Sequence, residues 1–247
     1  MEKVYILGAA RTPIGGLQGS FAGTSASKLG GAAIAGALAA AEVATDQVDE
    51  LIMGCVLAAG QGQAPARQAG FAAALSQDVP ATTVNKMCGS GMKTTMMGFD
   101  QLALNGNEIM VVGGMESMTQ APYLLPKMRV GARLGHGQVH DSMFLDGLED
   151  AYDQGRLMGT FAEDCATKFQ FTREAQDAYA LRSLERALSA QSSGAFASEI
   201  VSVSCTTRKE PIQIFVDEQP ANARPEKIQN LKPSFREGGT VTAANSS

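Results

Sequence analysis

The sequence of 247 residues predicts an α/β fold, in which a layered unit of parallel strands and helices in residues 1–118 precedes a mixed α and β region in residues 119–247. In the first region, short apolar runs alternate with longer helix-prone segments. In the second region, strand-like and helix-like segments do not alternate, and proline- and glycine-rich stretches separate them. Strands that alternate with helices lie parallel, so we expect helices on both faces of a sheet in the first region.

Four strands are expected in the first region. Each is a short run of apolar and β-branched residues bounded by turn-forming residues, which is typical of strands. The runs are KVYILGAA at 3–10, ELIMGCV at 50–56, ATTVNKM at 81–87 and NEIMVVGG at 107–114. The first run ends in the turn sequence RTPIGG, so the chain should leave the sheet there.

Three helices should join these strands. They are expected at residues 25–43, 65–77 and 89–106. The first is Ala-rich, with Ser25 or Ser27 as its N-cap. The second begins with Pro65, a residue favoured in the first helical turn, and the third ends at Gly106.

The second region begins with a long irregular stretch, residues 121–141, which we expect to be an ordered loop with a role in function or assembly. Helices are then expected at 158–170 and 172–194, and strands at 198–205 and 211–218. Thr172 is the expected N-cap of the longer helix, and Gly194 its stop. Within the last ten residues, TVTAA at 240–244 reads as apolar, half-buried backbone, so we expect the sequence to be a piece of a longer protein.

The composition excludes several classes of function. Hydrophobic residues make up 45% and charged residues 18%, which is typical of a globular protein. The net charge of −5 argues against a nucleic-acid or membrane-surface partner, and no apolar run reaches the length of a membrane span. The N-terminus lacks the features of a signal peptide, so we expect a cytoplasmic protein with reduced thiols. Four scattered cysteines and two histidines predict no metal site.

Cys88 is the candidate nucleophile. It lies between the expected strand 81–87 and the expected helix 89–106, and neither Gly89 nor Gly91 has a side chain that would obstruct a bulky acyl donor. A helix N-terminus favours the thiolate, which is the reactive form of cysteine. The backbone N–H of Cys88 is also placed to meet an oxyanion on a bound acyl group. On these spacings alone, a buried structural thiol is an equally good interpretation.

A base for this nucleophile is harder to find in the sequence. Cysteine nucleophiles usually need a histidine partner, but His136 and His140 lie in the irregular stretch, where we expect surface positions. The chemistry is therefore expected to be incomplete within this chain. The remaining thiols lie in strand-like or amphipathic contexts and are interpreted as packing residues: Cys55, Cys165 and Cys205.

Five separated motifs resemble those of the thiolase family, and of bacterial acetyl-CoA C-acetyltransferases within it. They are AARTPIGGLQGSFA at 9–22, VNKMCGSGMK at 84–93, GGMESMTQAPY at 113–123, GTFAEDCA at 159–166 and GGTVTAANSS at 238–247. The resemblance implies a fold of two similar βαβαβαββ halves packed in layers, with a loop domain inserted in the first half. Residues 1–118 match the first half, and residues 119–247 match the loop domain and the start of the return to the core.

The resemblance also implies a reaction. Two acetyl-CoA molecules condense to acetoacetyl-CoA through an acyl-cysteine, and the reverse reaction is thiolysis. Cys88 matches the cysteine that carries the acyl group, and its N–H matches one oxyanion donor. The family's histidine, asparagine-held water and second cysteine belong to its second half and have no counterpart here, so we expect this chain to be inactive alone.

Coenzyme A contacts carry over by position from the family. The matching residues are Leu148, Met158, Phe235, Ala243 and Ser247, and Arg224 lies near the position of a further contact. Two departures from the pattern affect the detail of phosphate binding. Leu157 stands where many biosynthetic members have a histidine. Ala221 stands where an arginine usually meets the nucleotide phosphates, which leaves Arg224 for that contact. The resemblance implies acyl-CoA substrates and no separate cofactor.

Assembly and substrate length are the least determined features. The segment 124–137 matches the loop through which thiolase dimers join as tetramers, so a homotetramer is expected for the full-length protein; a flexible surface loop is the alternative. Other functions stay open: a longer-chain 3-ketoacyl-CoA thiolase, a ketoacyl-synthase-like condensing enzyme, or a non-catalytic module with the thiolase fold.

Overall fold

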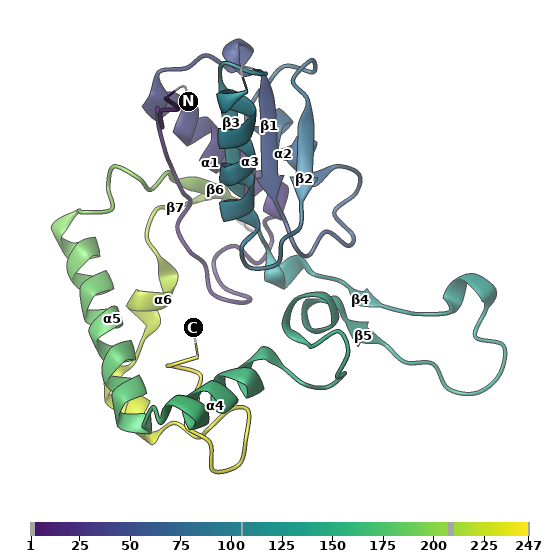
Figure 1. Cartoon of the computed structure of the whole chain (residues 1–247), viewed down its shortest axis with the longest axis vertical. Coiled ribbons are helices and arrows are strands. Elements are labelled where there is room, and N and C mark those ends of the chain that lie inside the picture. Colours follow the sequence, from purple (N-terminus) through teal and green to yellow (C-terminus); the bar gives the residue numbers. More distant parts are fainter. Residues whose placement is uncertain (1–2, 105, 207–209, 247) are drawn as a thin grey trace.

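A computed structural model describes residues 3–104, 106–206 and 210–246 (Figure 1). Its first part is a parallel three-stranded sheet, in the order β2-β1-β3, formed by β1 (Glu50–Gly54), β2 (Ala81–Val84) and β3 (Met110–Gly114). Leu51 of β1 is in register with Ala81 on one side and Val111 on the other. The central strand is buried, because both its edges are paired and helices cover both its faces.

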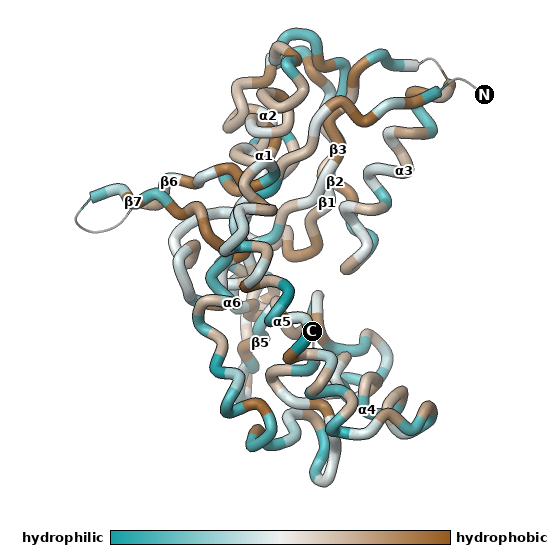
Figure 2. The backbone as a smooth tube through the Cα atoms, turned by 90° about the vertical axis from the view of Figure 1, so that its left-hand side faces the viewer, coloured by the Kyte–Doolittle hydropathy of each residue, from teal (hydrophilic) through white to brown (hydrophobic). Residues whose placement is uncertain are grey.

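Helices α1 (Ala26–Ala41) and α2 (Pro65–Ala72) lie on one side of the sheet, and α3 (Ser90–Ala103) lies on the other, as Figure 2 shows from the side. The expected parallel sheet between two helix layers is therefore confirmed. The helix starts are confirmed as well. Ser25 caps α1 by accepting a hydrogen bond from the Lys28 N–H at 3.3 Å, and Pro65 opens α2.

The prediction of a strand at residues 3–10 is wrong. This segment is extended, but it makes no ladder hydrogen bonds among the described residues, and Tyr5, Ile6 and Leu7 are exposed. A groove of about 330 Å³ separates the segment from the edge of β3. Residues 3–10 have strand propensity, but a strand also needs an adjacent partner. The first backbone pairing along the chain comes just after this segment, at the bridge between Arg11 and Ile200.

The second region wraps below the sheet in Figure 1. The irregular stretch contains a short antiparallel pair, β4 (Tyr123–Leu124) and β5 (His140–Asp141), whose connecting loop projects away from the rest of the molecule. The later elements are α4 (Met158–Phe169), α5 (Arg173–Ser193), β6 (Val203–Cys205), β7 (Ile212–Ile214) and α6 (Glu218–Asn222). Short 3-10 helices occur at Thr45–Gln47, Met118–Gln120, Met128–Val130 and Pro225–Asn230, and a short π-helix at Phe144–Leu148.

The ends of α5 match the prediction, because Thr172 caps it and Gly194 ends it with φ of 74°. The pair β6 and β7 is antiparallel, with Ser204 opposite Gln213. None of the described helices is both long enough and apolar enough to cross a membrane.

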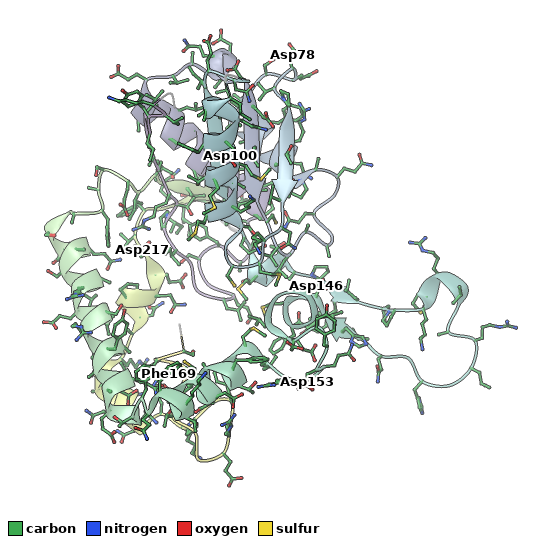
Figure 3. The ribbon with its side chains drawn as sticks, in the orientation of Figure 1. Asp78, Asp100, Asp146, Asp153, Phe169 and Asp217 are labelled. Carbon is green, nitrogen blue, oxygen red and sulfur yellow. The ribbon has the colours of Figure 1, made fainter. Side chains whose placement is uncertain are left out.

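A polar clamp joins the N-terminal segment to α6 in the second region. Arg11 donates two hydrogen bonds to the buried carboxylate of Asp217, at 2.7 and 3.0 Å, and the Ile14 N–H donates a third at 2.8 Å. The hydrogen bond from Arg11 is the main reason that the pKa of Asp217 lies below its usual value. Figure 3 labels Asp217 at the start of α6, where the second region approaches the first.

Candidate active site

Cys88 lies in a tight turn between β2 and α3. Met87 just before it has φ of 50°, in the left-handed region that a non-glycine residue seldom adopts. The Ser90 hydroxyl holds the turn, because its Oγ donates to the Met87 carbonyl at 2.6 Å and accepts from the Lys86 N–H at 2.8 Å. Cys88 is exposed, two residues before the first residue of α3. The expected helix start near Gly89 or Ser90 is confirmed.

The thiol opens into a cavity of about 430 Å³ at the carboxyl ends of β1 and β3. The wall is mostly apolar and includes Leu148, one of the predicted coenzyme A contacts. The other lining residues are Gly54–Leu57, Met87, Ser90, Gly91, Gly114–Glu116, Met118 and Gly147. A pocket of this size and character is suited to a small acyl group and the thioester end of its carrier.

Glycines allow the strand ends and the helix start to meet at this cavity. A Cβ on Gly54 would lie 2.6 Å from the Ser90 Cβ and 2.9 Å from the Gly91 backbone nitrogen. Neither is a flexible side-chain end that can move aside. Only a residue without a side chain lets β1 run this close beneath α3, so Gly54 helps to place the Cys88 turn over the cavity.

Glu116 is a lining residue that the sequence did not single out. Its carboxylate accepts the backbone N–H groups of Val56 at 2.8 Å and Leu57 at 3.2 Å, and it lies 3.6 Å from the Cys55 thiol. Burial, together with the Glu116 charge, raises the pKa of Cys55 to about 11. Cys55 therefore keeps its proton at neutral pH, which leaves Cys88 as the thiol in this cavity suited to nucleophilic attack.

A second cavity, of about 950 Å³, lies between α5, α6 and the end of the described chain. It brings together two of the predicted coenzyme A contacts, Arg224 and Ala243, and adds Lys227 and Tyr179. Two cations beside an aromatic ring and small apolar residues suit a nucleotide with phosphates.

Met158 and Phe235 lie outside the linings of these two cavities. Met158 begins α4 and is exposed, and the Phe235 ring packs where a side chain on Gly159 would stand. Ser247 lies outside the described residues. Of the predicted contacts, Leu148 therefore lies beside Cys88, Arg224 and Ala243 line the second cavity, and Met158 and Phe235 line neither.

The histidines are held in the projecting hairpin. His140 belongs to β5 and pairs with Leu124, and His136 lies in the exposed connecting loop. Among the described residues, no hydrogen bond joins either imidazole to Cys88. The described chain thus presents a nucleophile whose partner base does not come from its own histidines.

Comparisons with known proteins indicate the family of this chain. The thiolase N-terminal domain family matches residues 4–247. An acetyl-CoA acetyltransferase of Schizosaccharomyces pombe is 45% identical over 99% of this chain and 62% of its own length. One from Pseudomonas aeruginosa is 45% identical over 100% of this chain and 63% of its own length. The crystal structure of Acat5 thiolase from Ascaris suum in complex with coenzyme A superposes with a TM-score of 0.91 at 36% identity, over 99% of this chain and 62% of that one.

This chain spans less than two thirds of the length of the relatives it matches. The family match and the fold match nevertheless cover nearly all of this chain. The family match over residues 4–247 includes the Cys88 turn and the residues that line both cavities. The chain therefore belongs to the thiolase family.

Proposed function

We propose that this chain is the nucleophile-bearing part of an acetyl-CoA acetyltransferase. The observation that carries the proposal is an exposed cysteine at the start of α3, opening into an apolar cavity of about 430 Å³. Relatives named acetyl-CoA acetyltransferase, about 45% identical over the whole chain, support the same assignment. Acetyl-CoA is the proposed substrate, and no separate cofactor is required.

In the first stage, the Cys88 thiolate attacks the carbonyl carbon of acetyl-CoA. A bond forms between the Cys88 Sγ and the acetyl carbon, the bond from that carbon to the coenzyme A sulfur breaks, and coenzyme A leaves as a thiolate that takes up a proton. Negative charge develops on the carbonyl oxygen during the attack. Among the described residues the Cys88 N–H has no hydrogen-bond acceptor, so it is free to stabilise that oxyanion.

In the second stage, a second acetyl-CoA loses a proton from its α-carbon, and the resulting carbanion attacks the acetyl-cysteine. A carbon–carbon bond forms, the bond to Cys88 breaks, and acetoacetyl-CoA leaves. The proton goes to a base that the family resemblance assigns to the second half of the thiolase fold. The 950 Å³ cavity would hold the nucleotide end of coenzyme A, with Arg224 and Lys227 facing its phosphates.

The finer features belong to the same proposal. We place the protein in the cytoplasm as a homotetramer joined through residues 124–137. The projecting position of this hairpin and the exposure of Val130 and Leu134 at its tip support a role in assembly. A longer-chain 3-ketoacyl-CoA thiolase is the nearest alternative, and competition between acetyl-CoA and longer acyl-CoA donors would distinguish the two.

The test is covalent labelling of this 247-residue protein by acetyl-CoA. Intact mass should rise by one acetyl group, and peptide mapping should place the group on Cys88. The Cys88→Ala variant should gain no acetyl group, whereas Cys165→Ala, which removes another exposed thiol, should still be labelled. Absence of the adduct on the native protein, or its persistence in Cys88→Ala, would support a non-catalytic module instead.

A further inference from the structure

Two buried carboxylates hold the walls of the 950 Å³ cavity without lining it. The first is Glu163 of α4, which is 2% exposed. It accepts the Thr240 N–H at 3.0 Å, the Val241 N–H at 2.8 Å and the Thr240 hydroxyl at 3.4 Å. Within the described chain, no cation pairs with it. Backbone donors from one short segment therefore compensate the burial of this charge.

The second carboxylate is Asp177 of α5, which is 4% exposed. Its Oδ1 accepts from the Asn245 side-chain amide at 2.9 Å, and its Oδ2 pairs with Arg173 at 2.7 Å. Arg173 in turn donates to the Ile228 carbonyl at 2.9 Å. One carboxylate thus reaches two different segments of the chain, one directly and one through an arginine.

Both segments are walls of the cavity. Residues 243–246 form one wall, which begins two residues after Val241, the second of the two residues whose backbone N–H groups Glu163 holds. Lys227 and Ile228 belong to the other wall, at the carbonyl that Arg173 holds. A hydrogen bond within the segment also holds the first wall, because the Asn245 side-chain amide donates to the Thr240 carbonyl at 3.1 Å.

We propose that Glu163 and Asp177 are positioning residues for coenzyme A, acting through the 240–245 segment and the 225–230 turn. This inference rests on the proposed function, since it takes coenzyme A as the occupant of the cavity. It goes further by assigning the shape of the cavity to two side chains that do not touch the ligand. The 243–246 wall lies in no helix or strand, and the 225–230 wall is only a short 3-10 helix, so side-chain anchors rather than ladder bonds set the position of these two walls.

Glu163 needs both carboxylate oxygens for this role. Three donors converge on them, and Gly239 allows the backbone to approach, because a Cβ there would collide with the carboxylate. A glutamine has nearly the same shape, but it presents an NH₂ group to an N–H donor. Glu163→Gln therefore keeps the volume and one accepting oxygen, but it removes the charge and the second acceptor, so the Thr240 and Val241 backbone is held more weakly.

The experiment compares coenzyme A binding by calorimetry in the 247-residue protein and its variants. Glu163→Gln should weaken affinity for coenzyme A roughly tenfold or more, as expected when hydrogen bonds to a buried charge are lost. Asp177→Asn should weaken it through the other anchor, and it tests the proposal if Glu163→Gln does not fold. Asp49→Asn is the control, because Asp49 also receives two backbone N–H bonds, at 2.8 and 2.9 Å, but lies at the sheet and outside the lining of this cavity.

A second readout separates positioning from general stability. S-acetyl-N-acetylcysteamine is a thioester without a nucleotide, so it should acetylate Cys88 at the native rate in both variants. Native-like coenzyme A affinity in the variants would overturn the positioning role and leave the proposed function intact. Equal loss of coenzyme A binding and of labelling by the short thioester would overturn it in favour of a general structural role. A native protein that is acetylated at Cys88 but binds no coenzyme A would overturn the cavity assignment and this inference with it.

Discussion

Two thiols line one cavity, and their surroundings give them opposite chemical character. Cys88 is exposed in a turn, whereas Cys55 is buried at the end of β1 beside the Glu116 carboxylate. A buried thiol next to a negative charge holds its proton, so it is a poor nucleophile at neutral pH. Of the two cysteines in this cavity, only Cys88 is therefore suited to attack an acyl donor.

This difference predicts selective alkylation. Brief treatment of the native protein with iodoacetamide at pH 8 should modify Cys88 and leave Cys55 unmodified, because the pKa of Cys55 is about 11 and its side chain is buried. Peptide mass mapping measures both sites in one sample. Denatured protein is the control, and there Cys55 should react as well. Equal modification of the two thiols in the native protein would contradict this account of the cavity.

At the residue scale, the sequence predicted what depends on neighbours in the chain. Cys88 stood out because two glycines and a helix start follow it within three residues. Glu116 did not stand out, because its partners Val56 and Leu57 lie about sixty residues earlier and offer only backbone N–H groups. A backbone donor has no signature in the sequence, so such a contact becomes visible only when the fold is known.

At the element scale, the contact between β1 and α3 depends on the absence of one side chain. Gly54→Ala should lower the free energy of unfolding by about 1–3 kcal/mol, because the added Cβ meets the Ser90 Cβ and the Gly91 nitrogen rather than open space. Urea denaturation measures the change. Gly91→Ala is the matched control.

The two variants make the same change, glycine to alanine, but the space around the new Cβ differs. A Cβ on Gly91 would lie 3.6 Å or more from its neighbours, which is ordinary contact, and alanine favours a helix. Gly91→Ala should therefore leave stability within about 1 kcal/mol of the native value or raise it. Similar decreases in the free energy of unfolding in both variants would mean that the close contact between β1 and α3 is not what destabilises Gly54→Ala.

Sequence patterns predicted where helices begin, but they did not predict whether residues 3–10 pair as a strand. Ser25, Pro65 and Thr172 act on N–H groups or dihedral angles within their own turn, so their sequence signals were sufficient. A strand is defined by a partner elsewhere in the chain. Residues 3–10 carry the right side chains, but the nearest sheet edge lies across a groove, so the pattern predicted propensity and not pairing.

At the scale of the whole molecule, the two regions depend on the polar clamp at the start of α6. Arg11 pairs with both Asp217 and Glu199, and the neighbouring Glu218 accepts the Gly16 N–H at 3.0 Å and the Ser20 N–H at 2.9 Å. All these partners are about two hundred residues apart, so no local pattern in the sequence indicated the clamp. It holds Gln219 and Pro220 beside Ile14 and Gly15, and all four residues line the 950 Å³ cavity.

This clamp predicts a pH dependence of stability. The pKa of Asp217 lies below the value of 3.8 that the unfolded chain would have, mainly because Arg11 donates to its carboxylate. A carboxyl group with a lowered pKa in the folded state stabilises the fold above the unfolded pKa, and this contribution is lost as pH falls through the folded pKa. The native protein should therefore lose stability as pH falls from about 5 towards 3.

Asp217→Asn should be less stable at pH 7 by about 1–3 kcal/mol, and its stability should decline less steeply than that of the native protein between pH 5 and pH 3. Urea denaturation at a series of pH values measures both quantities, with Asp46→Asn, an exposed carboxylate in the Thr45–Gln47 turn, as the control. A parallel decline in the native protein and in Asp217→Asn would mean that other carboxylates, not this clamp, govern the acid limit of the fold.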